Sequence, residues 1–236
     1  MATRGLREIL ADAGGGVFPP SDGSVTVVPQ PSPREAGVLA LSAHTVVFTD
    51  EDPDWVRATL AATPGDPLAA PLCPPFLAAF ARRTGRENGN IDLLTVAGRL
   101  PGGPPLPLTR VADLEHPRVV RALRYREDVR VFETEGEGGA EGGAEGEGEG
   151  GAEGGSGVLV LGRGVAGRWE CAIEVGPAAR GRGLGRALAL AARHLVPEGD
   201  RVWSQQAPGN ATSVRAFQAA GYRPVGAETL LVVGRP

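Results

Sequence analysis

Three glycines and three arginines are interleaved in one short stretch of the chain. Gly181, Gly183 and Gly185 stand between a strand-like segment and an amphipathic helical one. Glycine lowers helix propensity, so this spacing favours a turn whose backbone comes close to another group. The amides that begin the following helix have no intrahelical acceptors, and the helix dipole makes that end positive. The stretch therefore predicts an anion site, and phosphate is the usual anion at such a place.

Two common phosphate motifs do not fit this stretch. A P-loop requires a lysine, and the 236-residue chain contains none. A dinucleotide fingerprint requires G-x-G-x-x-G, whereas the glycines here give G-x-G-x-G. The pattern R-x-x-G-x-G does fit, from Arg180 to Gly185, shortly after a strand that ends in Val175. It resembles the acyl-CoA pyrophosphate loop of the GCN5-related N-acetyltransferase (GNAT) superfamily, bacterial type.

A second stretch resembles the same superfamily. The segment from Asn210 to Tyr222 is similar to the pattern N-x-x-[SA]-x-x-x-[YF]-x-x-x-G-[FY] that closes GNAT domains. It follows the first motif at a suitable distance, in the same strand–helix–strand order. The resemblance covers roughly residues 105–236, whereas residues 1–100 match no part of the superfamily.

The resemblance implies how an acyl-CoA would be held. It implies two parallel strands that part, Trp169–Val175 and Arg201–Ala207, with the pantetheine arm bonded to the backbone of one of them. The turn amides would hold the pyrophosphate with added arginine charge, and the last helix would touch the CoA chain. The implied cofactor-binding residues are Ile173, Val175, Arg180, Gly181, Arg182, Gly183, Leu184, Gly185, Arg186, Asn210 and Ser213.

The acid–base residues are less clearly marked. Glu170 and Glu174 share one face of the strand before the turn, and each is a candidate general base for an attacking amine. The alternative is that one or both are only solvated or ion-paired. Relatives place a tyrosine in the last helix as general acid, but that position is Phe217. Proton return to CoA would then come from water, Ser213 or the N-terminal segment.

Two functions follow from the resemblance. The first is an acyl-CoA-dependent N-acyltransferase that moves acetyl from acetyl-CoA, its co-substrate, to a primary amine by direct attack. The second is a catalytically weak acyl-CoA-binding sensor or interaction module, which Phe217 and the acidic insertion at 134–157 favour. The amine acceptor is not indicated. No metal is expected, because the three histidines and Cys73 and Cys171 have no ligand spacing, and Cys171 is expected in the core rather than as a nucleophile.

Charge is unevenly distributed along the chain. The formal net charge is −4, yet residues 134–157 alone carry seven Glu and no basic residue. Residues 158–236 carry ten Arg against five acids, a balance that suits a phosphorylated ligand and is too scattered for nucleic acid. No apolar run approaches a membrane span, and the N-terminus is too polar for a signal peptide. We therefore expect a cytoplasmic protein with free thiols and no membrane partner. The sequence leaves a homodimer possible.

Regular elements must position these residues. The N-terminal part suggests an α+β segment, with helices expected at Arg4–Ala11, from Pro53 and at Phe76–Arg83, and strands at Val25–Val28, Gly37–Ala43, Thr45–Thr49 and Ile91–Val96. The later part suggests helices at Pro117–Arg126, after Gly183 and after Asn210, and strands at Leu106–Val111, Asp128–Glu133, Val158–Leu161, Trp169–Val175, Arg201–Ala207, Tyr222–Val225 and Thr229–Val233.

The domain organisation follows from low-complexity segments. A Pro/Gly-rich run near residues 100–105 separates an unassigned α+β segment, 1–100, from a GNAT-like domain, 105–236. The Glu/Gly/Ala insertion 134–157 is expected to be disordered and to inflate the turn of a β-hairpin. The fold class is α/β (α+β), a GNAT-type mixed, mostly antiparallel central sheet flanked by helices, with an additional N-terminal α+β segment.

Overall fold

A computed structural model describes residues 4–112, 115, 117–134 and 156–233 of the chain. The helices are α1 Leu6–Gly15, α2 Pro53–Ala61, α3 Pro74–Thr84, α4 Pro117–Leu123, α5 Leu184–Leu195 and α6 Ala211–Ala219. The strands are β1 Val25–Val28, β2 Glu35–Leu41, β3 His44–Phe48, β4 Arg86–Gly98, β5 Thr109–Arg110, β6 Glu127–Glu133, β7 Gly157–Arg163, β8 Trp169–Val175, β9 Arg201–Gln206 and β10 Arg223–Val233.

The strands form a mixed sheet. Its order, within the described residues, is β1-β3-β2-β10-β4-β9-β8-β7-β6-β5. The pairs β1–β3 and β8–β9 are parallel. The pairs β2–β3, β2–β10, β5–β6, β6–β7 and β7–β8 are antiparallel. The predicted fold class, a mixed and mostly antiparallel sheet flanked by helices, is confirmed.

The chain divides into two compact units. Unit 1 comprises Met1–Thr95, Gln205–Gly209 and Pro224–Pro236, and unit 2 comprises Val96–Ser204 and Asn210–Arg223. The predicted division near residues 100–105 differs from this, because the last strand and the end of β9 group with the N-terminal part. We describe each unit by itself.

Unit 1 is built on a strand–turn–strand core covered by helices. Strands β2 and β3 form the expected hairpin, with Val38 opposite Val47 in register. Helices α2 and α3 close the apolar face of these strands, and the Phe76 and Phe80 rings of α3 lie 5.7 Å apart. Helix α3 ends where Gly85 adopts a φ of +66°, a conformation that glycine reaches without steric cost.

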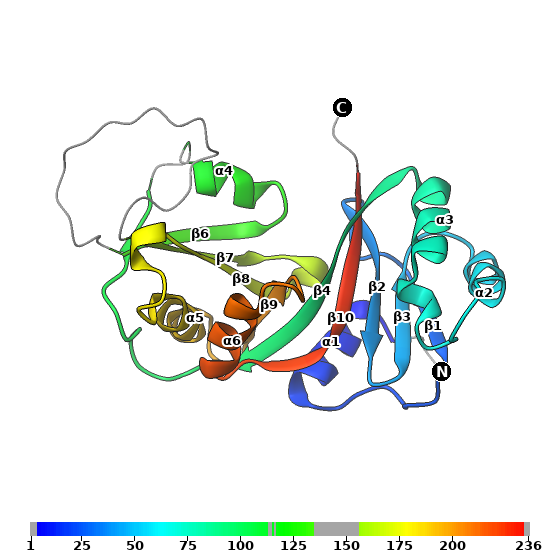
Figure 1. The fold of residues 1–236 in the computed structure, drawn as a ribbon, viewed down its shortest axis with the longest axis horizontal. Coiled ribbons are helices and arrows are strands. Elements are labelled where there is room, and N and C mark those ends of the chain that lie inside the picture. The colour runs from blue at the N-terminus through cyan, green and yellow to red at the C-terminus, as the bar shows by residue number, and fades with distance from the viewer. Residues whose placement is uncertain (1–3, 113–114, 116, 135–155, 234–236) are drawn as a thin grey trace. The chain divides into compact units, whose positions relative to one another are not determined.

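Unit 2 is a layered structure around β5 to β9. Helix α4 lies on one side of its strands and helices α5 and α6 lie on the other (Figure 1). The α5 side is packed by an apolar cluster that includes Leu159, Leu161, Leu188 and Phe217. A smaller cluster packs α4 against β6 and β7 through Val119, Ala122, Val131, Val158 and Val160. The side chains on both faces of β7 are therefore buried.

Strands β6 and β7 form the hairpin expected on either side of the insertion. Glu133 pairs with Val158, and beyond this pair the amide of Thr134 donates to the Gly157 carbonyl at 2.9 Å. Regular pairing therefore continues up to residues 134 and 157. The prediction of disorder falls on residues 135–155, which lie outside the described residues.

Several expected boundaries are wrong. The two closing strands are one strand, β10, since Gly226 does not turn the chain but lies against β2, where a Cβ would meet the Ala40 carbonyl. The strand expected at Ile91–Val96 extends over Arg86–Gly98, and the one expected at Leu106–Val111 is only Thr109–Arg110. The first helix continues to Gly15, and Gly16, with φ +90°, ends it.

Candidate acyl-CoA site

Strands β8 and β9 pair only at their beginning. Their parallel ladder consists of Trp169 opposite Val202 and Glu170 opposite Trp203. The ladder stops there, while β8 runs on to Val175 beside β7. Two parallel strands that begin together and then part are what the GNAT resemblance implies for an acyl-CoA cleft.

The hydrogen-bonding of β7 shows which backbone groups of β8 face the open edge. Gly157 uses both its amide and its carbonyl on Thr134, so it does not bond Val175, its register partner in β8. The amide of Gly176 instead donates to Ser156 at 2.9 Å. Because bonding direction alternates along a strand, the amides and carbonyls of Ile173 and Val175 point away from β7. These are the two residues expected to bond a pantetheine arm.

A short turn joins β8 to α5 through two glycines in left-handed conformations. Gly181 has φ +76° and Gly183 has φ +84°, and an added Cβ at either would meet no atom within 4 Å. The backbone conformation therefore explains these glycines, and crowding does not. Gly185 differs, since a Cβ there would lie 3.6 Å from Val175 and 3.7 Å from Ile173. The beginning of α5 thus packs directly on the end of β8.

The beginning of α5 exposes amides and positive charge together. Helical bonding starts with the amide of Ala187, which donates to Gly183 at 3.1 Å, so the preceding amides of the first turn have no acceptor within the helix. No acidic residue lies in that turn. Arg180 donates from Nε to the Val175 carbonyl at 3.2 Å, while Arg182 and Arg186 are exposed and form no ion pair with any described residue.

Helix α6 begins as the sequence predicts. The Oδ1 atom of Asn210 accepts a hydrogen bond from the Ser213 amide at 3.0 Å, which makes Asn210 the N-cap. Asn210 is exposed and Ser213 is partly exposed. Ala220 caps the other end, and Gly221 follows it with φ +85°.

Glu170 is buried and fully engaged. One carboxylate oxygen accepts from Arg168 Nε at 2.8 Å and from the Val165 amide at 3.2 Å, and the other accepts from Arg126 Nε at 3.3 Å. Burial acts to raise the pKa of Glu170, but the two guanidinium charges outweigh it and hold the pKa below its usual value. Neither oxygen is turned to solvent, since only 4% of the residue is exposed.

Glu174, the other predicted base, lies on the same face of β8. It is half-buried and sits opposite Val158 of β7, with exposed Ala172 between it and Glu170. Glu174 directly precedes Val175, at the end of β8 that leads into the glycine turn. The structure therefore separates the two predicted bases by environment.

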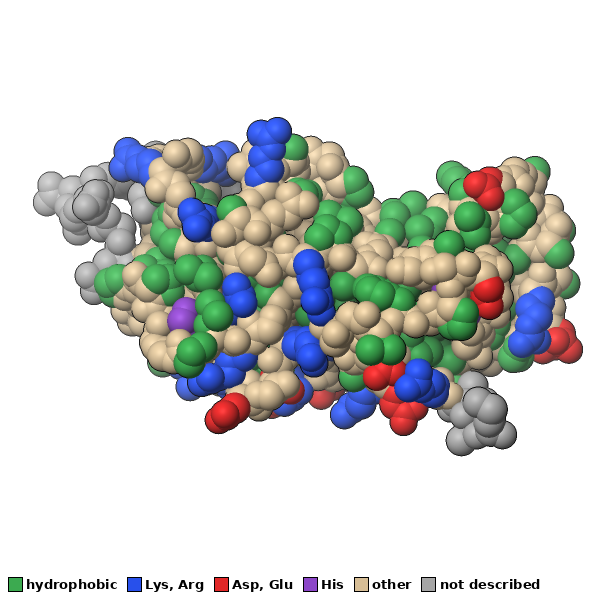
Figure 2. Space-filling view, turned by 90° about the horizontal axis from the view of Figure 1, so that it is seen from below, with side chains coloured by type: hydrophobic (Ala, Val, Ile, Leu, Met, Phe, Trp, Pro, Cys, Tyr) green, Lys and Arg blue, Asp and Glu red, His purple; other side chains and the backbone are tan. Residues whose placement is uncertain are grey.

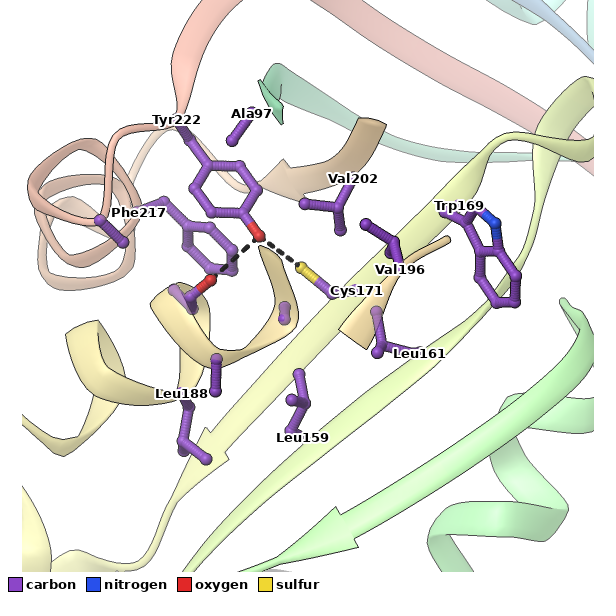
Figure 3. Packing of buried hydrophobic residues seen from close by; sticks show 14 residues of the cluster. Ala97, Leu159, Leu161, Trp169, Cys171, Leu188, Val196, Val202, Phe217 and Tyr222 are labelled. Carbon is purple, nitrogen blue, oxygen red and sulfur yellow. Dashed lines mark hydrogen bonds between the residues drawn. The ribbon is translucent and has the colours of Figure 1, made fainter. Parts of the chain in front are cut away.

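The hydroxyl and thiol of this region are packed inside the α5 core. Figure 3 shows the Tyr222 hydroxyl between Cys171 and the backbone of α5. It donates to the Ala189 carbonyl at 3.1 Å, so the bond to Cys171 Sγ at 3.3 Å uses the thiol proton. Burial raises the pKa of Cys171 to about 11 and that of Tyr222 well above its usual value. The Phe217 ring, which carries no ionisable group, meets the Tyr222 ring edge-on, with the ring centroids 4.9 Å apart.

Sequence reasoning missed the two arginines that hold Glu170. Arg168 lies two residues before Glu170, directly before β8, and this spacing in an extended chain indicates side chains on the same side. Arg126 lies 44 residues away, after α4, and no sequence pattern connects it to β8. The approach of Arg126 depends on tertiary packing.

A second buried polar group lies in unit 1. Glu228 of β10 accepts from Gln205 Nε2 at 3.0 Å and is 2% exposed. Gln206 Nε2 donates a hydrogen bond to the buried Thr95 Oγ1 at 3.2 Å. Burial, and next the charge of Glu228, raise the pKa of Asp92. The sequence indicated no role for these residues.

Surface charge and composition add three observations. Figure 2 shows arginine side chains spread over one face and separated by hydrophobic and neutral surface. Among the described residues, no three His, Cys, Asp or Glu side chains are grouped so that they could hold a metal ion. Within the same residues, no helix has the length and hydropathy needed to span a membrane.

Comparisons with known proteins identify a family for part of the chain. Residues 154–222 match the acetyltransferase (GNAT) family. The match confirms the resemblance expected from the two motifs and, in general terms, supports acyl transfer from acyl-CoA. No curated protein sequence matches the chain.

Solved structures similar to this chain are also GNAT proteins. One from Novosphingobium aromaticivorans is 15% identical, with a TM-score of 0.41, over 64% of this chain and 68% of its own. A GCN5-related N-acetyltransferase from Kribbella flavida is 15% identical, with a TM-score of 0.39, over 99% and 98%. A tandem GNAT protein from the clavulanic acid biosynthesis pathway is 14% identical, with a TM-score of 0.37, over 85% and 65%. At these values they inform on neither substrate nor residue roles.

Proposed function

We propose that the protein transfers an acyl group, acetyl in the first instance, from acyl-CoA to a primary amine, because residues 154–222 match the acetyltransferase (GNAT) family. One observation supports this most strongly. The open edge of β8 at Ile173 and Val175 leads directly into a turn of left-handed glycines and the basic beginning of α5. A long polar chain that ends in a pyrophosphate fits that sequence of groups.

The cofactor would lie along β8. The backbone of Ile173 and Val175 would bond the amides of the pantetheine arm as a neighbouring strand does. The amides of the glycine turn and of the first turn of α5, from Gly181 to Arg186, would bind the pyrophosphate, with Arg182 and Arg186 adding charge. Asn210 and Ser213 would contact the CoA chain from the beginning of α6.

The reaction would proceed by direct attack. The amine nitrogen adds to the thioester carbonyl carbon, the carbon–sulfur bond breaks, and CoA leaves as a thiolate that takes a proton from water. The Val175 amide faces the open edge and would stabilise the oxyanion. Glu174 would receive the proton of the amine through water, because it is partly exposed and precedes Val175 at the end of β8, whereas Glu170 is buried.

An activity assay tests this proposal. Free thiol is followed during incubation of the protein with acetyl-CoA and a panel of primary amines. We expect amine-dependent thiol release, a loss of about 10²-fold or more in kcat for Glu174→Gln, and no change for Glu198→Gln, an exposed glutamate outside the site. Equal rates for the two variants would remove Glu174 from the mechanism.

A second candidate function has a specific observation in its favour. Phe217 occupies the position where relatives carry a tyrosine acid, and the Tyr222 hydroxyl is committed to Ala189. The protein would then bind acyl-CoA as a sensor or interaction module without turnover. Raised thermal stability with acetyl-CoA, combined with no thiol release for any amine, would support this function over the enzyme.

A further inference from the structure

Glu170 stands at the place where β8 and β9 separate. It forms the last pair of their ladder, opposite Trp203, and the next residues of β8 begin the open edge. Whatever fixes Glu170 therefore also fixes the direction in which that edge leaves β9. Its side chain points to the α4 side of the strand, away from the α5 core.

The Glu170 carboxylate bonds three residues from two separate segments of unit 2. Arg126 comes from the segment between α4 and β6, and Val165 and Arg168 come from the turn between β7 and β8. Arg168 is 8% exposed and its guanidinium lies over the Trp203 ring, 5.3 Å from the centroid. The network thereby reaches β9 at the residue that pairs with Glu170.

The turn before β8 leaves no room for this carboxylate to move. A Cβ on Gly164 would overlap the carboxylate carbon and both oxygens of Glu170. Gly164 has φ −104°, so its lack of a side chain is required by the contact and not by its φ angle. The carboxylate is enclosed by its two arginines, the Val165 amide and the Gly164 backbone.

We infer that Glu170 is a positioning residue, whose carboxylate joins Arg126, Arg168 and the β7–β8 turn and so sets the open edge of β8 that receives acyl-CoA. It contacts neither acyl-CoA nor amine and takes no proton in the reaction. The inference rests on the proposed function for the identity of the ligand. It goes beyond that function by giving the predicted base Glu170 a different role.

Two substitutions disturb the network while retaining the Glu170 carboxylate. Gly164→Ala displaces the carboxylate, and Arg126→Gln removes one of its cations. Gly103→Ala is the matched control, since a Cβ there meets no atom within 4 Å and its φ is not left-handed. We expect both test variants to weaken CoA binding by about tenfold or more, measured by calorimetry, because small displacements of a binding edge are costly. The control should bind like the wild type.

Amide hydrogen exchange provides a readout that needs no ligand. Faster exchange in Trp169–Val175 and Val202–Trp203 of both variants, with unchanged exchange in β1 to β3, is the expected local effect. Unchanged exchange at the β8–β9 junction together with wild-type CoA affinity would overturn the inference. If the wild type binds no CoA, the proposed function fails, and the exchange data still decide whether Glu170 holds the junction.

The pH dependence of turnover separates a positioning residue from a base. If Glu170 were the base, Arg126→Gln would remove a cation beside it and move the acid limb of kcat/KM to higher pH. We expect that limb to stay where the wild type has it, while KM for acetyl-CoA rises more than kcat falls. A shifted acid limb with unchanged KM would assign the base to Glu170 and contradict the inference.

Discussion

The titratable side chains of unit 2 owe their states to their immediate neighbours. Cys171 and Tyr222 are held neutral by burial in the α5 core, whereas Glu170 is held ionised by two arginines. These three side chains therefore keep their protonation states near neutral pH. Glu174, the other predicted base, is partly exposed and lies near the end of β8.

Cysteine reactivity tests the burial of Cys171. Its pKa of about 11 and its lack of exposure keep it as an unreactive thiol at mildly alkaline pH, whereas Cys73 is partly exposed. Iodoacetamide at about pH 8 should modify Cys73 alone in the native protein and both residues in denaturant, as counted by mass spectrometry. Rapid native labelling of Cys171 would contradict the packing shown in Figure 3.

Acid stability tests the ion pairs of Glu170. Because its pKa is lowered on folding, the unfolded chain binds the extra proton, and stability should fall as pH drops from about 4.5 through the folded pKa. Glu170→Gln has no carboxylate to protonate, so its free energy of unfolding, measured in urea titrations, should fall less steeply with pH in that window. The two slopes should differ by up to about 1.4 kcal/mol per pH unit. Parallel curves for the two proteins would show that Glu170 is not ionised by its arginines.

At the scale of elements, local signals and long-range pairing contributed different information. Strands β1 and β8, the hairpin β2–β3 and the N-cap Asn210 could be predicted, because alternation and capping are local. The length of β4 could not, since its early residues Asn88, Gly89 and Asn90 have poor strand propensity and gain their conformation from the sheet. The motif residues of the site were found by resemblance, whereas Arg126 was not, because nothing local connects it to Glu170.

The glycine turn before α5 carries an exposed arginine, Arg182, whose charge should contribute to CoA binding. Arg182→Gln should weaken CoA binding by about threefold to tenfold and lower its salt dependence, since one exposed cation near the phosphates is lost. The control Arg201→Gln changes an exposed arginine at the beginning of β9 and should leave CoA affinity unchanged. Pantetheine, which lacks the pyrophosphate, should bind wild type and Arg182→Gln equally. An equal loss with pantetheine would place the effect elsewhere.

At the scale of the whole molecule, the chain passes between its two units at residues 95–96, 204–205, 209–210 and 223–224. Strand β10 returns to unit 1, where it pairs with β2 and buries Leu231 completely. The sequence suggested a separable domain because the Pro/Gly-rich run near residue 100 resembles a linker. Strands β2 and β10 pair although most of the sequence lies between them, so no local pattern reveals this pairing.

A truncated chain tests this organisation. Residues 105–236 alone lack β2, so the edge of β10 and the side chain of Leu231 lose their cover, at a cost of about 1.5–3 kcal/mol for each large apolar side chain exposed. We expect this fragment to aggregate or to unfold without a cooperative transition, with the full chain as control. A cooperatively folded fragment that binds CoA would instead support a self-sufficient domain.

The most direct test of the account is hydrogen exchange with and without CoA at single-residue resolution. We predict slower exchange, on adding CoA, at the amides of Ile173 and Val175, which face the open edge, and of Gly181–Arg186, which form the glycine turn and the beginning of α5. Amides of β1 to β3 in unit 1 should not change. CoA binding that leaves β8 and the glycine turn unprotected, or no binding at all, would contradict the assignment of this site.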